Sequence, residues 1–210
     1  MKITVFGAGS VGGTLGRRLA SAGHDIHFGV TDPRSEKTRK LVAEINAKAG
    51  TVAEAAKDAE VVILATPWDA VQDALQNAGD LRGKIIVDCT NPLAMSADGL
   101  SLTVGFDQSG AELIAGLVPG SHVCKAFNQT GFGNMAEPGY GGKQSVMFVC
   151  GDDAASRAVV CKLSEQIGFE TIDAGPLRIA RLLEPLAMLW IHLAFNTELK
   201  RDFAFALLRR

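Results

Sequence analysis

The apolar residues of the chain form two kinds of pattern that alternate along the sequence. Short β-branched runs, several of them apolar at every position, alternate with Ala-rich segments of helical periodicity. Strands that are apolar throughout are buried on both faces, as in a parallel sheet covered by crossover helices. The pattern predicts strands at Lys2–Phe6, Asp25–Val30, Glu60–Ala65, Lys84–Cys89, His122–Phe127, Ser145–Cys150 and Phe169–Asp173.

Helices are expected between these strands. A short extra strand is expected near Gly50–Val52, where Thr51 and Glu54 also have the spacing of a capping box. The alternation predicts an α/β fold, a doubly wound and mostly parallel sheet over residues 1–174. The predicted helices are Ser10–Ala22, Arg34–Ala47, Asp69–Asn77, Ser109–Leu117 and Asp153–Ile167.

The pattern changes at Gly175. Residues 175–210 contain no strand run and predict a small helical C-terminal subdomain of two or three helices, with Pro176 and Pro185 in first turns. The second of these helices is apolar on nearly every face between Leu186 and Phe195. A helix of this kind must be buried, so we expect it to pack on the sheet domain, on a partner subunit, or on both.

Composition excludes several classes of partner. The chain of 210 residues has a net charge of -2 and scattered basic residues, which argues against nucleic acid. Its cysteines (Cys89, Cys124, Cys150 and Cys161) form no C-x-x-C pair, and the longest apolar run is too short to span a bilayer. No signal peptide or metal site is predicted, and we expect a cytoplasmic protein with reduced thiols.

The strongest motif is the glycine-rich stretch after the first strand. Gly7, Gly9 and Gly12 form G-x-G-x-x-G between a predicted strand and helix, the context in which this motif binds a dinucleotide. Gly7 allows the tight turn, Gly9 lets the backbone approach a pyrophosphate, and Gly12 lets the helix pack closely. Ser10, followed by Val11, could cap the helix or donate to a phosphate.

The end of the second strand bears on the choice of cofactor. The acid that binds the ribose of NAD would occupy position 30, which is Val30. Its absence favours NADP(H), and Thr31, Arg34 and Lys37 offer a hydroxyl and two cations for the 2′-phosphate. Asp32 could instead turn toward the ribose, or the segment could be only a turn and helix cap.

Three further strand ends should border the cofactor, because ligands lie outside the carboxyl ends of strands in doubly wound sheets. No general base is evident there, and the apolar surroundings of His192 favour a buried structural role. Lys125, inside an apolar strand, could be buried toward the site or extend to water. Hydride transfer between two cofactors needs no such base. The bordering residues are Ala65, Thr66 and Pro67, then Asn91 and Pro92, then Asn128.

The chain resembles the F420-dependent NADP oxidoreductases. The stretches "VFGAGSVGGTLGRRLASAGH", "VVILATPWDAV", "IIVDCTNPL", "VCKAFNQTG", "VCGDD" and "DAGPLRIARLLEPL" follow the family's order to about Leu186. The resemblance implies a Rossmann domain with a helical C-terminal subdomain that completes a deazaflavin cleft and makes a homodimer. Family members commonly end the second strand with Gly-Ser-Arg. Here these positions are Gly29, Val30 and Thr31, so Arg34 or Lys37 would have to replace the phosphate contact.

The expected function is therefore hydride transfer between NADP(H) and coenzyme F420 or a flavin-like acceptor, with no side chain acting as acid or base. One alternative is a flavin-linked or ferric reductase, like the cytosolic domain of the six-transmembrane metalloreductases. A β-hydroxyacid or imine reductase is disfavoured, because the chain is too short for the long helical substrate domain of those enzymes. A non-catalytic NADP(H) sensor is the alternative from a different class.

Overall fold

The computed structural model describes residues 1–97 and 99–210, and its centre is one twisted sheet. The strand order is β12-β11-β8-β5-β4-β1-β2-β3, and every neighbouring pair is parallel except β8 and β11. The order β3-β2-β1-β4-β5-β8 is that of the Rossmann sheet, so the predicted fold class is confirmed. The strands are β1 (Lys2–Phe6), β2 (Asp25–Gly29), β3 (Lys48–Gly50), β4 (Val61–Leu64), β5 (Ile85–Asp88), β8 (His122–Lys125), β11 (Val146–Gly151) and β12 (Glu170–Gly175).

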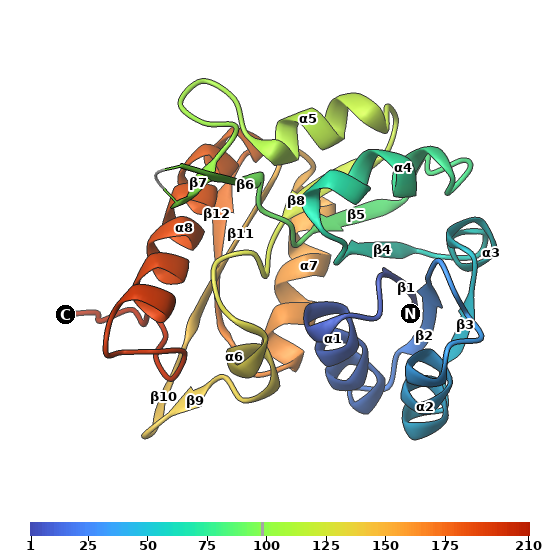
Figure 1. Cartoon of the computed structure of the whole chain (residues 1–210), viewed down its shortest axis with the longest axis horizontal. Coiled ribbons are helices and arrows are strands. Elements are labelled where there is room, and N and C mark those ends of the chain that lie inside the picture. The colour runs from blue at the N-terminus through green and yellow to red at the C-terminus, as the bar shows by residue number, and fades with distance from the viewer. Residues whose placement is uncertain (98) are drawn as a thin grey trace.

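Helices cover both faces of this sheet (Figure 1). One face packs against α1 (Ser10–Ser21), α2 (Glu36–Ile45) and α7 (Ala154–Gln166). The other packs against α3 (Val52–Ala56), α4 (Val71–Gln76), α5 (Gly110–Leu117) and α8 (Ala180–Asn196). Strand residues such as Val5 and Val62 are fully buried on opposite faces, which explains the continuous apolar runs.

Side chains cap several of the helices. Thr51 and Glu54 form the predicted capping box at α3, and Ser109 and Glu112 form another at α5. Ser35 caps α2 by accepting from Thr38 N. The segment after β2 therefore forms a turn and a helix cap, which was one of the two alternatives that the sequence analysis gave for it.

Several short elements were not predicted from the sequence. They are too short to produce a periodic signal. They are the hairpin β6 (Leu93–Ser96) and β7 (Gly99–Leu102), helix α6 (Phe132–Ala136), the hairpin β9 (Gly139–Tyr140) and β10 (Lys143–Gln144), and 3₁₀ turns at Trp68–Ala70 and Leu177–Ile179.

The C-terminal region differs from its prediction. One helix, α8, continues through Pro185, and only a 3₁₀ turn precedes it, so a helix starting at Pro185 was wrong. The loss of one N–H is tolerated because the residues on both sides of Pro185, Leu183 and Ala187, are buried on the same face.

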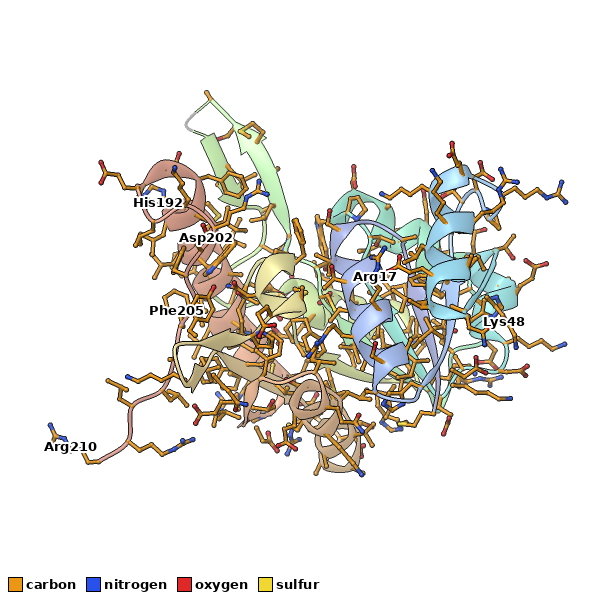
Figure 2. All side chains as sticks on the ribbon, turned by 90° about the horizontal axis from the view of Figure 1, so that it is seen from below. Arg17, Lys48, His192, Asp202, Phe205 and Arg210 are labelled. Atoms are coloured by element: carbon orange, nitrogen blue, oxygen red, sulfur yellow. The ribbon has the colours of Figure 1, made fainter. Side chains whose placement is uncertain are left out.

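The other faces of α8 are partly exposed. Leu182 is 66% exposed, Leu189 48% and Phe195 60%, so α8 packs on the sheet domain along one side, and the single chain leaves its other apolar side chains exposed. His192 is exposed rather than buried and lies on the outer side of α8 (Figure 2). Both the homodimer through this helix and the subdomain boundary at residue 175 stay predictions.

A buried ion cluster joins α8 to the sheet. Lys125 Nζ lies 2.7 Å from Asp88 Oδ2 and 2.8 Å from Glu184 Oε1, and these side chains are at most 1% exposed. Lys125 also donates to Thr90 O, while Glu184 accepts from the first backbone N–H groups of α5. Burial alone would lower the pKa of Lys125, but the two carboxylates outweigh it and raise the pKa.

Lys125→Met should lower the free energy of unfolding by about 3–5 kcal/mol, because it leaves two buried carboxylates without a counter-charge. Lys40→Met, which breaks the exposed pair with Glu36, is the matched control and should change stability little. Chemical denaturation measures both, and a loss below about 1 kcal/mol in Lys125→Met would contradict this role.

The pH dependence has a defined sign. Because the folded pKa of Lys125 is raised above its ordinary value of 10.5, its contribution is complete below that pH. The contribution is lost only as the pH rises through the folded pKa. Above about pH 10.5, wild type should therefore lose stability relative to Lys125→Met.

Candidate functional site

The glycine-rich turn between β1 and α1 is shaped by two of its three glycines. Gly7 has φ +99°, a left-handed conformation that favours glycine, and a Cβ on Gly12 would lie 2.1 Å from Gly7 O. Both positions are therefore required by the backbone itself. A Cβ on Gly9, by contrast, would meet no atom within 4 Å. The open space at Gly9 is a cradle in which a ligand can approach the backbone.

The N-terminus of α1 is free to bind an anion. Gly9 is its N-cap and no side chain caps it, whereas Ser35, Thr51, Ser109 and Asp153 cap four other helices. A helix-capping role for Ser10 was thus wrong. The first N–H groups of α1 point out of the helix end with its positive partial charge, which suits a pyrophosphate.

Cavities lie on both sides of this turn. One has a volume of about 760 Å³ and is lined by Gly7, Gly9 and Thr31, and also by the end of β4 with Ala65, Thr66 and Pro67. The opposite one, of about 690 Å³, shares Ser10 and Val11 with aromatic residues of the C-terminal part, including Trp190 and Phe195. A third, of about 370 Å³, shares Gly9 with the first and Ser10 with the second. The three cavities surround the glycine-rich turn and are together called the groove below.

The third cavity contains a free cation. Lys37 lines it together with Arg17 and Lys40. Arg17 is paired with Glu44 and Lys40 with Glu36, but Lys37 has no ion-pair partner within residues 1–97 and 99–210. Lys37 is therefore available for a ligand phosphate.

The loop before α2 positions the remaining candidates for cofactor choice. Thr31 lines the cavity of about 760 Å³, whereas Arg34 lines none of the three cavities. The Asp32 carboxylate accepts a hydrogen bond of 2.9 Å from Arg34 N, so it serves a local turn.

The strand ends at β5 and β8 are linked to each other. Asn91 Nδ2 donates to Asn128 O, and Asn128 Nδ2 donates to Asn91 Oδ1 and to Leu183 O. Phe127, buried in a left-handed conformation with φ +61°, precedes Asn128 and turns the chain out of β8. These contacts fix the rim directly above the Lys125 ion cluster. Asn91, Pro92 and Asn128 do not line the three cavities, so their contact with a cofactor stays a prediction.

Two buried oxygen atoms at the carboxyl ends of the strands have unused hydrogen-bonding capacity. Thr66 Oγ1 and Asn128 Oδ1 find no partner in the described part of the chain. Buried polar atoms are rarely left unpaired, and unpaired ones often mark a position where a ligand or water binds.

Sequence reasoning missed the wall of the 690 Å³ cavity. Thr130, Asn134 and Tyr140 lie on and beside α6, and Arg201 and Asp202 come from the segment after α8. It also missed the partners of Lys125. Asp88 and Glu184 were detectable as isolated charges in apolar runs, since buried charges must be paired.

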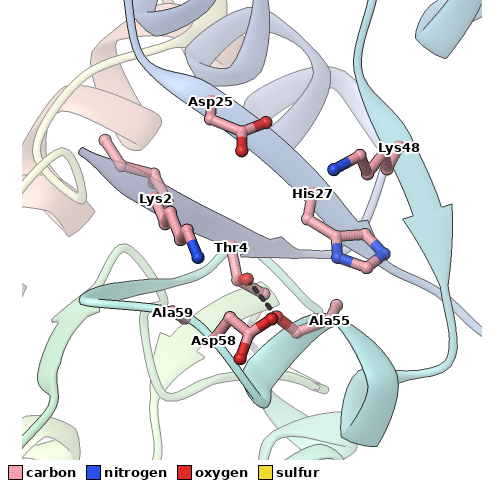
Figure 3. A pocket seen from close by; sticks show the side chains of 9 residues that line it. Lys2, Thr4, Asp25, His27, Lys48, Ala55, Asp58 and Ala59 are labelled. Carbon is pink, nitrogen blue, oxygen red and sulfur yellow. Dashed lines mark hydrogen bonds between the residues drawn. The ribbon is translucent and has the colours of Figure 1, made fainter.

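A small cavity elsewhere is not part of this groove. It has a volume of about 70 Å³ and lies beside the amino ends of β1 and β2, where it is lined by Lys2, Asp25, His27 and Asp58 among others (Figure 3). Burial and the neighbouring Lys48 lower the pKa of His27. Ligands of doubly wound sheets bind at the opposite, carboxyl ends of the strands, so the position of this cavity argues against it as the site.

Within residues 1–97 and 99–210, no helix combines the length and the apolar character needed to cross a membrane. The free thiols of Cys89, Cys124 and Cys150 are buried, and Cys161 is half-buried. Burial raises the pKa of the Cys89 thiol well above its ordinary value, which makes it a poor nucleophile.

Known proteins share this sequence and fold. Residues 2–92 match the family described as NADP oxidoreductase, coenzyme F420-dependent. The F420-dependent NADP reductase of Methanothermobacter marburgensis is 29% identical over 95% of both chains. Rat metalloreductase STEAP3 is 30% identical over 89% of this chain, which spans 36% of the length of that relative.

A solved structure extends the match to the whole molecule. The crystal structure of a candidate F420-dependent NADP reductase from Arthrobacter sp. FB24 has a TM-score of 0.89 and 34% identity, with all of both chains covered. The order of strands, the glycine-rich turn and this full-length similarity agree. The chain therefore belongs to the F420-dependent NADP oxidoreductase family.

Proposed function

We propose that this protein is an NADP(H)-dependent oxidoreductase that exchanges hydride with coenzyme F420 or a flavin-like acceptor. The observation that carries the proposal is the set of three cavities around Gly9 and Ser10, one of which borders the glycine-rich turn and the end of β4 while another is lined by Trp190 and Phe195. NADP(H) supplies the hydride when it is bound. The protein supplies binding and orientation.

Three groups of residues are assigned to three parts of the dinucleotide. Gly7, Gly9, Ser10, Val11 and Gly12 form the pyrophosphate turn. The adenosine end is assigned to Thr31, Arg34 and Lys37, with Ala65, Thr66 and Pro67 along the groove between the two ends. The nicotinamide end is assigned to Asn91, Pro92 and Asn128, which follow the carboxyl ends of β5 and β8. No side chain is assigned as catalytic acid or base.

A second candidate is a reductase of free flavins or ferric chelates. The similarity to STEAP3 supports this alternative, because it covers 89% of the present chain. A non-catalytic NADP(H) sensor would use the same groove without an acceptor. Turnover with defined acceptors separates these functions.

Gly9→Val should abolish NADPH binding and leave the fold intact, because its side chain would enter the open cradle and meet no protein atom nearby. Gly116→Val is the matched control, since a Cβ there also meets nothing within 4 Å and Gly116 is on α5, outside the groove. We expect at least a hundredfold weaker NADPH binding for Gly9→Val, or about 2.7 kcal/mol. Titration of NADPH fluorescence measures it, and unchanged affinity would refute the pyrophosphate site.

The preference for NADPH over NADH should depend on Lys37. Lys37→Gln should weaken NADPH binding about tenfold or more and leave NADH binding unchanged, because a charge-assisted phosphate contact is lost. Lys40→Gln is the matched control, since Lys40 is already paired with Glu36. If only Arg34→Gln lowers the ratio of NADPH to NADH affinity, the 2′-phosphate is bound by Arg34 in the loop before α2. The assignment of this contact to Lys37 is then wrong.

A further inference from the structure

The wall of the 690 Å³ cavity contains a chain of three hydrogen-bonded side chains. Tyr140 OH donates to Asn134 Oδ1 at 2.5 Å, and Asn134 Nδ2 donates to Thr130 Oγ1 at 2.7 Å. All three residues line the cavity, together with Ser10 and Val11 of the glycine-rich turn. Helix α6, which contains Asn134, lies between α1 and the segment after α8 (Figure 2).

The direction of this chain is fixed by a backbone group. Asn134 Nδ2 also donates to Phe203 O at 2.7 Å, and a carbonyl oxygen can only accept. The amide nitrogen must therefore face Phe203 and Thr130, and the amide oxygen must face Tyr140. Asn134 is only 4% exposed, so water does not compete for these positions.

The hydrogen-bond directions determine where each proton points. Tyr140 must donate to Asn134, since an amide oxygen has no proton. Burial and the nearby Asp202 carboxylate raise the pKa of Tyr140, so its hydroxyl keeps that proton. Both amide protons of Asn134 are used, and Thr130 Oγ1 accepts one of them. The Thr130 hydroxyl proton has no acceptor in the described ranges, 1–97 and 99–210.

We propose that Thr130 is the specificity-determining hydrogen-bond donor to the electron acceptor, held in that role by Asn134 and Tyr140. Its hydroxyl donates to a carbonyl oxygen or ring nitrogen that is conjugated with the carbon receiving the hydride. This inference rests on the proposed function and adds a residue that selects heteroaromatic acceptors with such an atom.

The donor acts on charge that develops during the reaction. The hydride carries an electron pair from NADPH to the acceptor, and NADP⁺ is the second product. The pair is delocalised onto the conjugated oxygen or nitrogen, where the Thr130 hydroxyl stabilises it, and water supplies the proton that completes the reduced acceptor. A fixed donor at this position lowers the barrier because it needs no reorganisation when the charge appears.

The test compares Thr130→Val, which keeps the shape but removes the donor, with Thr130→Ser, which keeps the hydroxyl. Thr171→Val is the matched control. The hydroxyl of Thr171, in β12, donates a hydrogen bond to Ser164 of α7, and neither residue lines the cavity. Single-turnover hydride transfer from bound NADPH to coenzyme F420 should fall about 10- to 100-fold in Thr130→Val. Thr130→Ser should stay within about threefold of wild type, and NADPH affinity should be unchanged in all variants.

Several outcomes would overturn the assignment. Wild-type transfer rates in Thr130→Val would do so, as would equal losses in the Val and Ser variants, which indicate a packing role. A tenfold loss of NADPH affinity with an unchanged transfer rate would place the hydroxyl on the nicotinamide instead.

Binding separates this inference from the proposed function. If wild type transfers no hydride to coenzyme F420 or FMN, the proposed acceptor is wrong, and affinity of the NADP⁺ complex for each compound then tests the donor. A tenfold weaker affinity in Thr130→Val would support the donor, and unchanged affinity would refute it. Binding of neither compound to wild type would refute both proposals.

Discussion

The ammonium group of Lys125 is the charge on which the arrangement of this molecule depends. It lies in a fully buried position between Asp88 of β5 and Glu184 of α8. A buried ion cluster is not in itself a strong source of stability, because desolvation offsets much of the attraction. Its consequence here is positional. Each charge is costly without the others, so β5, β8 and α8 must keep their relative positions, and the N-terminus of α5 must remain on Glu184.

That constraint extends from the strand ends to the wall of the 690 Å³ cavity. The Asn91–Asn128 pair lies at the ends of the two strands joined by the ion cluster, and Asn128 also bonds Leu183, next to Glu184. Further along α8, Trp190 donates to Phe203 O and stacks on the Phe203 ring. Phe203 O in turn fixes Asn134. A continuous set of contacts thus runs from the buried cluster to the cavity wall, and the C-terminal segment completes that wall.

The features that depend on local periodicity were predictable from sequence. The buried strands, the glycine-rich turn and the Thr51–Glu54 capping box have strong local signals, and the structure confirms them. The pairing of Lys125 with Asp88 and Glu184 was not predictable, although each charge is isolated in an apolar run, because they are 37 and 59 residues away and only the fold brings them together. The Tyr140–Asn134–Thr130 chain depends on a backbone oxygen at Phe203, which no side-chain pattern reveals. The prediction that a helix starts at Pro185 was wrong, because tertiary packing rather than local propensity decides whether a helix continues.

The central claim is that the groove brings NADPH and a heteroaromatic acceptor together for hydride transfer. Its most direct test is single-turnover oxidation of bound NADPH with coenzyme F420, FMN, FAD and a ferric chelate, with bound NADH as the control. The account predicts that coenzyme F420 or a flavin oxidises bound NADPH. At equal concentration, the rate of NADH oxidation should be at least about tenfold lower. If NADPH binds but stays reduced with every acceptor, the protein is a binding module and the claim of hydride transfer is wrong.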